Sequence, residues 1–457
     1  MRSFVFLLAL LLCGSAQAWG QSALDDALLG FDDEASEVSD TETSGETAGK
    51  SLFDIYGSMS LSNSYNVAHK EPRANETDYR GLSRSRANVN LKLKANLSEK
   101  WKAHVGYRAF YDMAYAINGR DRYTSDVLQT YENETELREA YLHGELSRNL
   151  DIKFGRQIVV WGKSDNVRVT DVLNPLDNRE PGMVDIEDLR LPVYMSRLDY
   201  YLGDLSFTAI AIHEIRFNKT PSFGSDFYPF AVRAPVEDVP GDKIENTEYA
   251  FALNGLFTGW DISFYLADIY DDQPHVEQVA SLSSLSPAFK RSHSRLTMAG
   301  LAANMAYGSW LLKTEMAYFY GFEFFGTPDD KKSRYDILIG AEYSGFTDSV
   351  VSVELVNRHL NDFNDRIKTA GGTEDEFQVA IRASGNYFYD TLHPLALVSF
   401  FGTRGEDGGF QRVSVGYDLT DAWLLTVGAV FYQSGNLQFF KNVGDNDRLF
   451  LDFKYSF

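Results

Sequence analysis

Hydrophobic and polar residues alternate with a period of two along most of residues 51–457. From residue 87 to residue 97, Ala, Val and Leu occupy every second position, and Asn and Lys fill the positions between them. Residues 101–115 repeat this pattern after a short connection, 98–100. A period of two is typical of strands whose two faces meet different environments. The short connection predicts an antiparallel hairpin.

The same pattern predicts about eighteen strands. Short connections such as "SEK", "SRN" and "LTD" alternate without a break with long ones such as 116–133, 162–190 and 217–245. Tight turns at one end and long loops at the other are typical of outer-membrane barrels. We therefore predict an all-β fold, a closed transmembrane antiparallel β-barrel of the outer-membrane porin type, with both termini in the periplasm. The strands are expected near 52–66, 84–97, 101–115, 134–147, 150–161, 191–202, 204–216, 246–258, 260–270, 294–307, 309–322, 333–345, 348–359, 375–389, 394–403, 409–419, 422–433 and 447–457.

Aromatic residues make up 14% of the chain and gather near the ends of the expected strands. Outer-membrane barrels carry such aromatic girdles where they meet the lipid boundary. The last strand is amphipathic and ends the chain on Phe457. A terminal aromatic residue there resembles the signal that the outer-membrane barrel-assembly machinery recognises. Outer-membrane lipid and that machinery are therefore the expected partners.

Residues 1–18 have the features of a secretory signal peptide, with an apolar run followed by Ala16-Gln17-Ala18. Residues 19–50 are rich in Asp and Glu and are predicted to form a disordered, acidic periplasmic leader. The barrel would then occupy residues 51–457. The role of the acidic leader stays open.

Charge and cysteine content exclude several classes of chemistry. The formal net charge of −22 argues against nucleic-acid binding. The single cysteine, Cys13, would leave with the signal peptide, which excludes disulfides and thiolate metal sites from the mature chain. Acidic stretches near Asp271 and Asp445 lack the spacing of a known calcium loop. We therefore predict no metal site and no cofactor.

An eighteen-stranded barrel is too wide for side chains alone to fill, so its polar face would line a water-filled lumen. The second and third strands and the fifth would project a set of basic and polar side chains inward. The basic ladder either concentrates anions or pairs with acids elsewhere, such as Asp151, Glu354 or Asp452. The expected pore-lining residues are Arg84, Arg86, Lys92, Lys94, Lys102, Arg108, Lys153, Arg156 and Gln157.

Simple alternation places Arg156 on the lipid face, where a charge is costly. Its inclusion among the pore-lining residues therefore needs a separate argument. Gly155 precedes it, and a glycine within a strand often marks a bulge. A bulge there would turn Arg156 into the lumen. Two other wall strands carry mixed charges, Lys313 with Glu315 and Glu354 with Arg358. These would either create a transverse field across the lumen, as in general porins, or form neutral pairs, and we favour the neutral pairs.

Residues 162–190 form a connection that is long for a surface loop. It combines many charges with buried-type residues such as Val167, Val169 and Leu173. It would either fold into the lumen and narrow it or remain an ordered external loop. The residues expected to form the constriction are Trp161, Lys163, Asp165, Arg168, Asp171, Asp177 and Arg179.

This region also carries a family resemblance. Gly155-Arg156-Gln157, Trp161-Gly162 and Asn174-Pro175-Leu176-Asp177 resemble the G-R-Q, W-G and N-P-x-D motifs of porin-like outer-membrane proteins of proteobacteria, a family of largely undefined function. More distantly, the chain resembles alginate-export porins. The resemblance implies a whole-chain barrel that works beside an inner-membrane transporter of the resistance-nodulation-division (RND) type.

The sequence predicts a passive channel of the Gram-negative outer membrane, selective for anionic or amphipathic solutes, and not an enzyme. Alternatives are a component working with an RND-type transporter, a sheath around a partner protein, and an outer-membrane hydrolase. The last would use a histidine beside an acid: His143 with Glu145, His213 with Glu214, or His359 with Asp362. None of these pairs has a recognisable nucleophile beside it in the sequence. The substrate, the direction of transport and the oligomeric state are not predicted.

Overall fold

The computed structural model describes residues 52–72, 76–184, 186–279, 288–325, 330–369 and 371–457. The predicted signal peptide and acidic leader lie outside the described residues. Among the described residues, no helix is long and apolar enough to cross a membrane.

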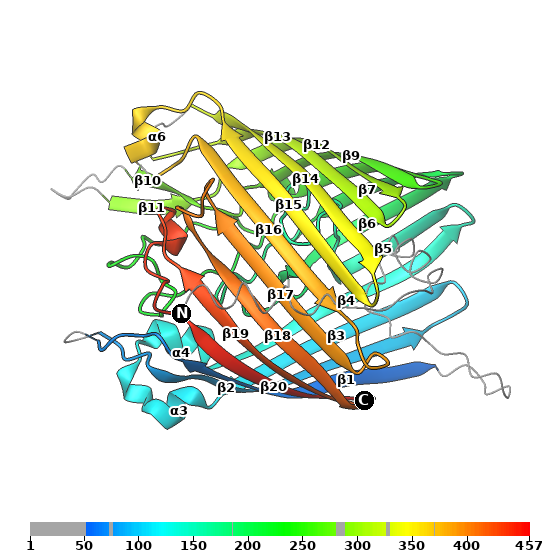
Figure 1. Cartoon of the computed structure of the whole chain (residues 1–457). Coiled ribbons are helices and arrows are strands. Elements are labelled where there is room, and N and C mark those ends of the chain that lie inside the picture. The colour runs from blue at the N-terminus through cyan, green and yellow to red at the C-terminus, as the bar shows by residue number, and fades with distance from the viewer. Residues whose placement is uncertain (1–51, 73–75, 185, 280–287, 326–329, 370) are drawn as a thin grey trace.

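Eighteen antiparallel strands form one closed barrel (Figure 1). Each strand pairs with its neighbour in the barrel, and the ring closes where β1 pairs with both β2 and β20. The strands are β1 (Phe53–Asn66), β2 (Gly81–Asn96), β3 (Trp101–Asp112), β4 (Asn133–Ser147), β5 (Leu150–Gln157), β6 (Val193–Leu202), β7 (Leu205–Ile212), β8 (Glu248–Phe257), β9 (Trp260–Tyr270), β12 (Arg295–Tyr307), β13 (Trp310–Phe322), β14 (Lys332–Phe346), β15 (Ser349–Leu360), β16 (Asp375–Gly385), β17 (Leu392–Phe401), β18 (Gly408–Thr420), β19 (Trp423–Gln433) and β20 (Arg448–Ser456).

The predicted fold is confirmed, and a strand lies at each of the eighteen predicted positions. Some strands end earlier than predicted: β5 ends at Gln157 and not at residue 161, β7 at Ile212 and not at residue 216, and β16 at Gly385 and not at residue 389. The other differences lie in the long connections. The stretch between β9 and β12 contains an additional hairpin, β10 (His275–Val279) and β11 (Ala288–Ser292), which alternation did not reveal. Other connections contain short helices: α3 (Ala114–Asn118), α4 (Ser125–Tyr131), α5 (Ile186–Leu189) and α6 (Asp365–Thr369).

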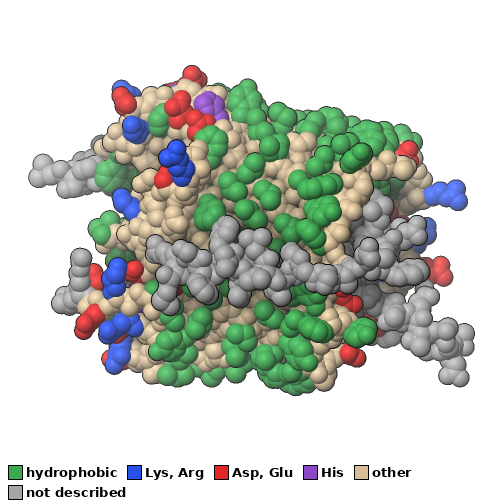
Figure 2. All heavy atoms as spheres, in the orientation of Figure 1, with side chains coloured by type: hydrophobic (Ala, Val, Ile, Leu, Met, Phe, Trp, Pro, Cys, Tyr) green, Lys and Arg blue, Asp and Glu red, His purple; other side chains and the backbone are tan. Residues whose placement is uncertain are grey.

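The outer surface of the barrel is apolar around its middle. On β1, the side chains of Ile55, Met59 and Leu61 are exposed, as are those of Phe264 and Leu266 on β9. Figure 2 shows hydrophobic side chains spread over the middle of the visible face, with charged side chains gathered at the two ends. Such an apolar belt is what a strand-built protein presents to lipid.

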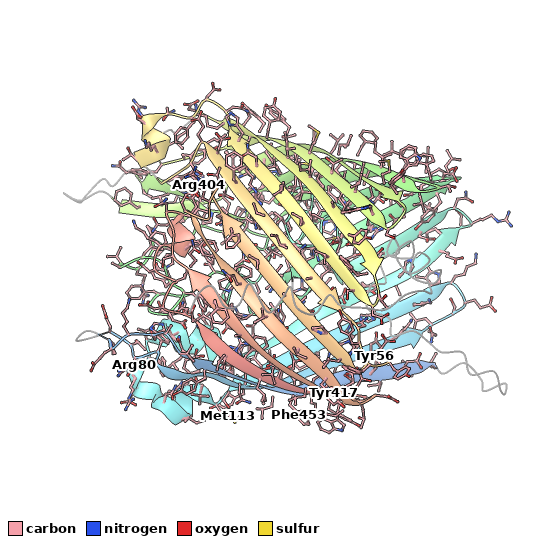
Figure 3. The ribbon with its side chains drawn as sticks, in the orientation of Figure 1. Tyr56, Arg80, Met113, Arg404, Tyr417 and Phe453 are labelled. Carbon is pink, nitrogen blue, oxygen red and sulfur yellow. The ribbon has the colours of Figure 1, made fainter. Side chains whose placement is uncertain are left out.

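The two ends of the barrel differ, as the alternation of connections predicts. The hairpin β10–β11 and the helices α3, α4 and α6 lie at one end, and the short turns lie at the other (Figure 1). Arg80 and Arg404 belong to the end with the long connections, whereas Tyr56 and Tyr417 lie toward the short turns (Figure 3). We refer to these as the long-loop end and the short-turn end.

The inner wall is polar on one side of the barrel and apolar on the other. On β2, the inward side chains include Arg84, Arg86 and Asn88. On β6 to β16, by contrast, many inward side chains are apolar and almost fully buried. They include Met195, Ile210, Ile212, Ala250, Ala267, Met298, Leu338 and Val356. Apolar side chains buried inside a wide barrel require a covering segment.

Candidate functional site in the barrel lumen

The segment that covers the apolar wall is the connection after β5. Trp161 stacks on Tyr265 of β9 with ring centroids 4.6 Å apart. Val167, Val169 and Leu173 are buried in one cluster with inner-wall residues of β6 to β16. Counted along the barrel, β13 is the sixth strand after β5 and β15 the eighth. A strand on the opposite side would be the ninth, so the segment reaches across the lumen.

Glu315 of β13 holds the beginning of this segment. Its side chain is fully buried. One carboxylate oxygen accepts the backbone N–H groups of Lys163, at 2.6 Å, and Ser164, at 2.8 Å. The other accepts the N–H of Thr170 at 2.9 Å and the hydroxyl of Thr170 at 2.7 Å. Hydrogen bonds to an ionised acceptor are stronger than neutral ones, so this carboxylate is a major anchor of the segment.

Glu354 of β15 is a second anchor of the same kind. It is 1% exposed and accepts the N–H groups of Asp165 at 2.7 Å and of Asn166 and Val167 at 3.0 Å each. The predicted pairing of Glu354 with Arg358 is therefore wrong, since Arg358 pairs with Glu376 at 2.8 Å. The predicted pairing of Lys313 with Glu315 is likewise wrong. Lys313 pairs instead with Asp165, in the inserted segment, and with Glu342.

Close approach to Glu315 explains why residue 162 is glycine. Gly162 has a φ of +88°, a region that disfavours residues with a side chain. A Cβ atom there would lie 2.6 Å from one carboxylate oxygen of Glu315 and 2.8 Å from the Thr170 hydroxyl. The Trp161-Gly162 motif thus has a physical basis, because the first residue packs on the wall and the second lets the backbone approach an acid.

Asp171 and Asn174 fix the shape of the segment itself. Asp171 accepts the N–H of Trp161 at 3.2 Å and pairs with Arg168 at 3.1 Å and Arg190 at 2.9 Å. Asn174, fully buried, accepts the N–H of Val159 at 2.8 Å and donates to two backbone carbonyls. The two ends of the loop, near residues 159 and 190, are thereby tied together.

The later part of the segment returns to the polar wall. Asp177 and Arg179 form an ion pair at 2.5 Å, and Arg179 also pairs with Glu134 of β4 at 2.7 Å. Burial opposes ionisation of Asp177, but its hydrogen bonds from Arg179 hold the pKa of this carboxyl below its usual value.

Glu180 joins the segment to the basic residues of β2. Its carboxylate lies 2.5 Å from Arg84 and 3.1 Å from Arg86, and Arg86 also pairs with Asp112 at 3.2 Å. Burial opposes the ionisation of Glu180, but the two guanidinium groups outweigh it and hold its pKa well below the usual range. Arg84 and Arg86 are therefore neutralised by Asp112, the acid that the sequence places opposite them on β3, and by Glu180, which the sequence did not indicate.

A second connection, residues 213–247, also folds inward, and the sequence did not single it out. Lys219 pairs with Glu134 and Glu136 of β4, and Arg216 pairs with Glu136. Farther along, Asp226 pairs with Arg448 of β20 at 2.8 Å. Phe227 is 1% exposed and lies in an apolar cluster with Met183 of the first segment. The sequence signals that could have identified it are its length and the pair of acids on β4, Glu134 and Glu136.

A narrow cavity lies where these two segments meet the wall at the long-loop end. Its lining combines tyrosine rings with charged groups. The lining includes Tyr79, Tyr115, Tyr123, Tyr131, Ser225, Glu180, Asp226 and Arg448. A second, smaller cavity is polar and is lined by Arg108, Phe110, Glu134, Glu136, Asp177 and Arg179.

The lower part of the basic ladder lies toward the short turns. Lys94 is directly across from His104 in the β2–β3 register. His104 stacks on Tyr141 with centroids 5.2 Å apart, and the ammonium group of Lys153 lies 4.0 Å from the centre of that ring. Lys92 contacts the ring of Tyr56, whereas Lys102 is exposed next to the short turn. The arginines Arg84 and Arg86 of the ladder thus lie toward the long-loop end, and its lysines lie toward the short-turn end.

Arg156 and Gln157 occupy the end of β5. Gln157 is fully buried under the inserted segment and donates to backbone carbonyls. Arg156 lies in register with Tyr194, an exposed residue. Its guanidinium pairs with Glu214, which lies just after β7, at 3.0 Å and lies 3.9 Å from Glu136 of β4.

The bulge expected at Gly155 is absent, because the register with both β4 and β6 continues through it. Gly155 instead has a φ of +129°, and a Cβ atom there would lie 2.2 Å from the carbonyl oxygen of Ala140. The glycine therefore permits close strand packing.

These features define the class of the molecule: an eighteen-stranded porin-type outer-membrane β-barrel whose lumen holds inserted loops. The chain belongs to the family described as "Protein of unknown function (DUF1302)", whose model matches residues 1–457. No curated protein matches the chain.

Solved structures of similar fold include three bacterial barrels. Acinetobacter baumannii OccAB3 is 10% identical, with a TM-score of 0.52 over 88% of this chain and 99% of that one. Pseudomonas aeruginosa OccK9 (OpdG) is 13% identical, with a TM-score of 0.52 over 88% and 98%. Pseudomonas aeruginosa OccK1 (OpdK) is 10% identical, with a TM-score of 0.51 over 88% and 98%. At 10–13% identity, the similarity to these three structures shows a shared fold and no more.

Proposed function

We propose that the protein is an outer-membrane channel for passive, substrate-selective passage of solutes, and that residues 162–190 form its constriction. The observation that carries the proposal is the anchoring of this segment across the lumen by Glu315 and Glu354. A loop fixed inside a barrel by two buried carboxylates narrows the route without closing the ring of strands. The similar bacterial barrels support the same architecture.

The lining of the lumen supports anionic or amphipathic substrates. An anion that passes the inserted segments meets Lys92, Lys94 and Lys153 on the polar wall. The rings of Tyr56 and Tyr141, which lie beside Lys92 and Lys153, offer aromatic surface to the apolar part of the same molecule. Positive charge in a narrow, low-dielectric passage raises the local concentration of anions. Arg84 and Arg86 contribute less to this positive charge, because the carboxylate of Glu180 compensates them.

The structure gives the alternative functions less support. A sheath around a threaded partner would need residues 162–190 to leave the lumen, against both carboxylate anchors. Of the three histidines considered for hydrolysis, His213 contacts a hydroxyl, Ser196, at 2.8 Å. Glu214 instead binds Arg156 and the N–H of Tyr194, so it does not orient that imidazole. Cooperation with an RND-type transporter remains a proposal from the family resemblance.

Single-channel recording in planar bilayers tests the constriction. Deletion of residues 165–188 removes most of the segment, including the residues that Glu354 holds, and should increase the conductance several-fold. The purified variant should first show the heat-modifiable gel mobility of a folded barrel. A folded deletion variant with unchanged conductance would overturn the assignment of this segment as the constriction.

Reversal potentials in asymmetric KCl test the charge preference. The triple change Lys92→Gln, Lys94→Gln and Lys153→Gln should shift the reversal potential toward cation selectivity. Lys70→Gln is the control, because its side chain is 81% exposed and pairs with Asp445 outside the barrel wall. A wild-type channel that prefers cations would contradict the anionic preference but not the constriction.

A further inference from the structure

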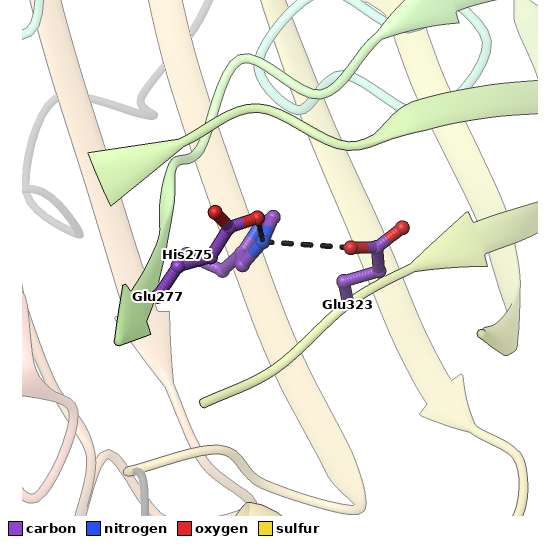
Figure 4. Close-up of side chains that lie close together, drawn as sticks. All are labelled: His275, Glu277 and Glu323. Carbon is purple, nitrogen blue, oxygen red and sulfur yellow. Dashed lines mark hydrogen bonds and ion pairs between the residues drawn. The ribbon is translucent and has the colours of Figure 1, made fainter. Parts of the chain in front are cut away.

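Three side chains from two neighbouring connections converge at the long-loop end. His275 and Glu277 belong to β10, and Glu323 follows the last residue of β13. Figure 4 shows the imidazole and the two carboxylates turned toward one another. The sequence gives no sign of the cluster, because Glu323 lies 46 positions after Glu277 and the three residues match no metal motif.

The spacing of the donor atoms suits a small cation. His275 Nε2 lies 3.1 Å from Glu277 Oε1 and 3.6 Å from Glu323 Oε2, and one donor atom from each residue lies within 4.8 Å of the others. In a tetrahedral zinc site with bonds of about 2.0–2.2 Å, donor atoms are about 3.3–3.6 Å apart. Only small side-chain movements are needed to bring all three donors to one ion.

His275 is already oriented as a metal ligand would be. Its side chain is 9% exposed, and Nδ1 lies 3.1 Å from the hydroxyl of Ser294, a buried residue. A histidine that binds a metal through one ring nitrogen usually donates the other to a hydrogen-bond acceptor. The contact with Ser294 therefore directs Nε2 toward the two carboxylates.

Two lysines contact the outer oxygens of the same carboxylates. Lys290 lies 3.3 Å from Glu277 Oε2, and Lys331 lies 3.5 Å from Glu323 Oε1. One oxygen of each glutamate is thus left directed at His275 Nε2. The lysines reduce the repulsion between the acids while leaving the inner donor atoms accessible to a cation.

We propose that His275, Glu277 and Glu323 bind one divalent transition-metal cation of the Zn²⁺ type, with water in the remaining position. One imidazole and two carboxylates favour such an ion over Ca²⁺ or Mg²⁺, which take oxygen ligands. The bound ion would join the β10–β11 hairpin to the connection after β13 at the mouth of the barrel. This role is separate from the constriction and does not depend on transport.

Titration calorimetry with Zn²⁺ alone tests the site, using the full barrel in detergent after tag removal and chelator treatment. We expect one ion per chain, and an affinity at least tenfold lower in His275→Gln and in Glu323→Gln. His393→Gln is the matched control, because His393 also faces a carboxylate, Asp418, at 2.8 Å but forms no ion pair with a second one among the residues that the structure describes. It should bind Zn²⁺ as the wild type does.

Hydrogen exchange provides the second readout. Zn²⁺ should slow exchange in residues 275–279 and 288–292 of the wild type and leave these segments unchanged in His275→Gln. If one variant fails to fold, the other, on a separate connection, gives the same test. Absence of stoichiometric binding, or equal affinity in wild type and folded variants, would overturn the proposal and indicate a simple ion-pair cluster.

Discussion

Replacing Glu315 with Gln tests how the inserted segment is held. The change preserves size but converts one acceptor oxygen into an NH₂ group. Whichever oxygen is replaced, two of the four hydrogen bonds from Lys163, Ser164 and Thr170 are lost, and their donors face another donor. Hydrogen bonds to charged groups contribute about 1.5–3 kcal/mol each. Docking of the segment should therefore weaken by about 3–6 kcal/mol.

The amide protons of Lys163, Ser164 and Thr170 are themselves the donors, so hydrogen exchange measures the effect directly. Since 1.4 kcal/mol corresponds to a factor of ten, their protection should fall by about a hundredfold or more. Single-channel records should show larger or fluctuating conductance. Glu342→Gln is the control, because Glu342 lies on the adjacent strand and contacts Lys313 at 3.4 Å. Unchanged protection in a folded Glu315→Gln barrel would refute the anchoring role.

The remaining predictions concern Gly162 and Glu180. Gly162→Ala places a methyl group against Glu315 and should lower protection of the segment by at least tenfold, whereas Gly203→Ala, in an open turn with φ +60°, should leave it unchanged. Because the pKa of Glu180 is lowered, its ion pairs contribute fully above the ordinary carboxyl value of about 4.3 and are lost only as pH falls below it. Exchange near residues 177–180, corrected for intrinsic rates, should thus be equal at pH 7 and pH 5. Loss of protection already at pH 5 would contradict the lowered pKa of Glu180. The variant Glu180→Gln should lack this protection at both pH 7 and pH 5.

Alternation was sufficient to predict the wall of the barrel, because each strand meets lipid on one face and the lumen on the other. The expectation that inward-facing residues are polar is wrong where a folded segment, and not water, covers the inner wall. On β7, "LSFTAIAI", inward Ile210 and Ile212 are as apolar as the outward residues. A strand that is apolar on both faces signals a covering segment, and this was the sign available in the sequence.

The site could be predicted only in part. Residues 162–190 stand out by length and composition, and the structure places them in the lumen. Their anchors do not stand out, since Glu315 and Glu354 look like ordinary wall charges paired with neighbours on their own strands. Their true partners are backbone N–H groups between 145 and 189 positions earlier, which no local pattern encodes. The inward course of residues 213–247 depends on similarly distant contacts.

That separation along the chain bears on the order of folding. Residues 162–170 are synthesised well before the strands that receive them, and docking requires β13 and β15 to be in place. Contacts of such long sequence separation form slowly, because loop-closure entropy opposes them until the rest is assembled. The apolar inner wall would then face water during assembly. Enclosure of the segment is therefore expected among the last steps of folding, close to the moment when β20 meets β1.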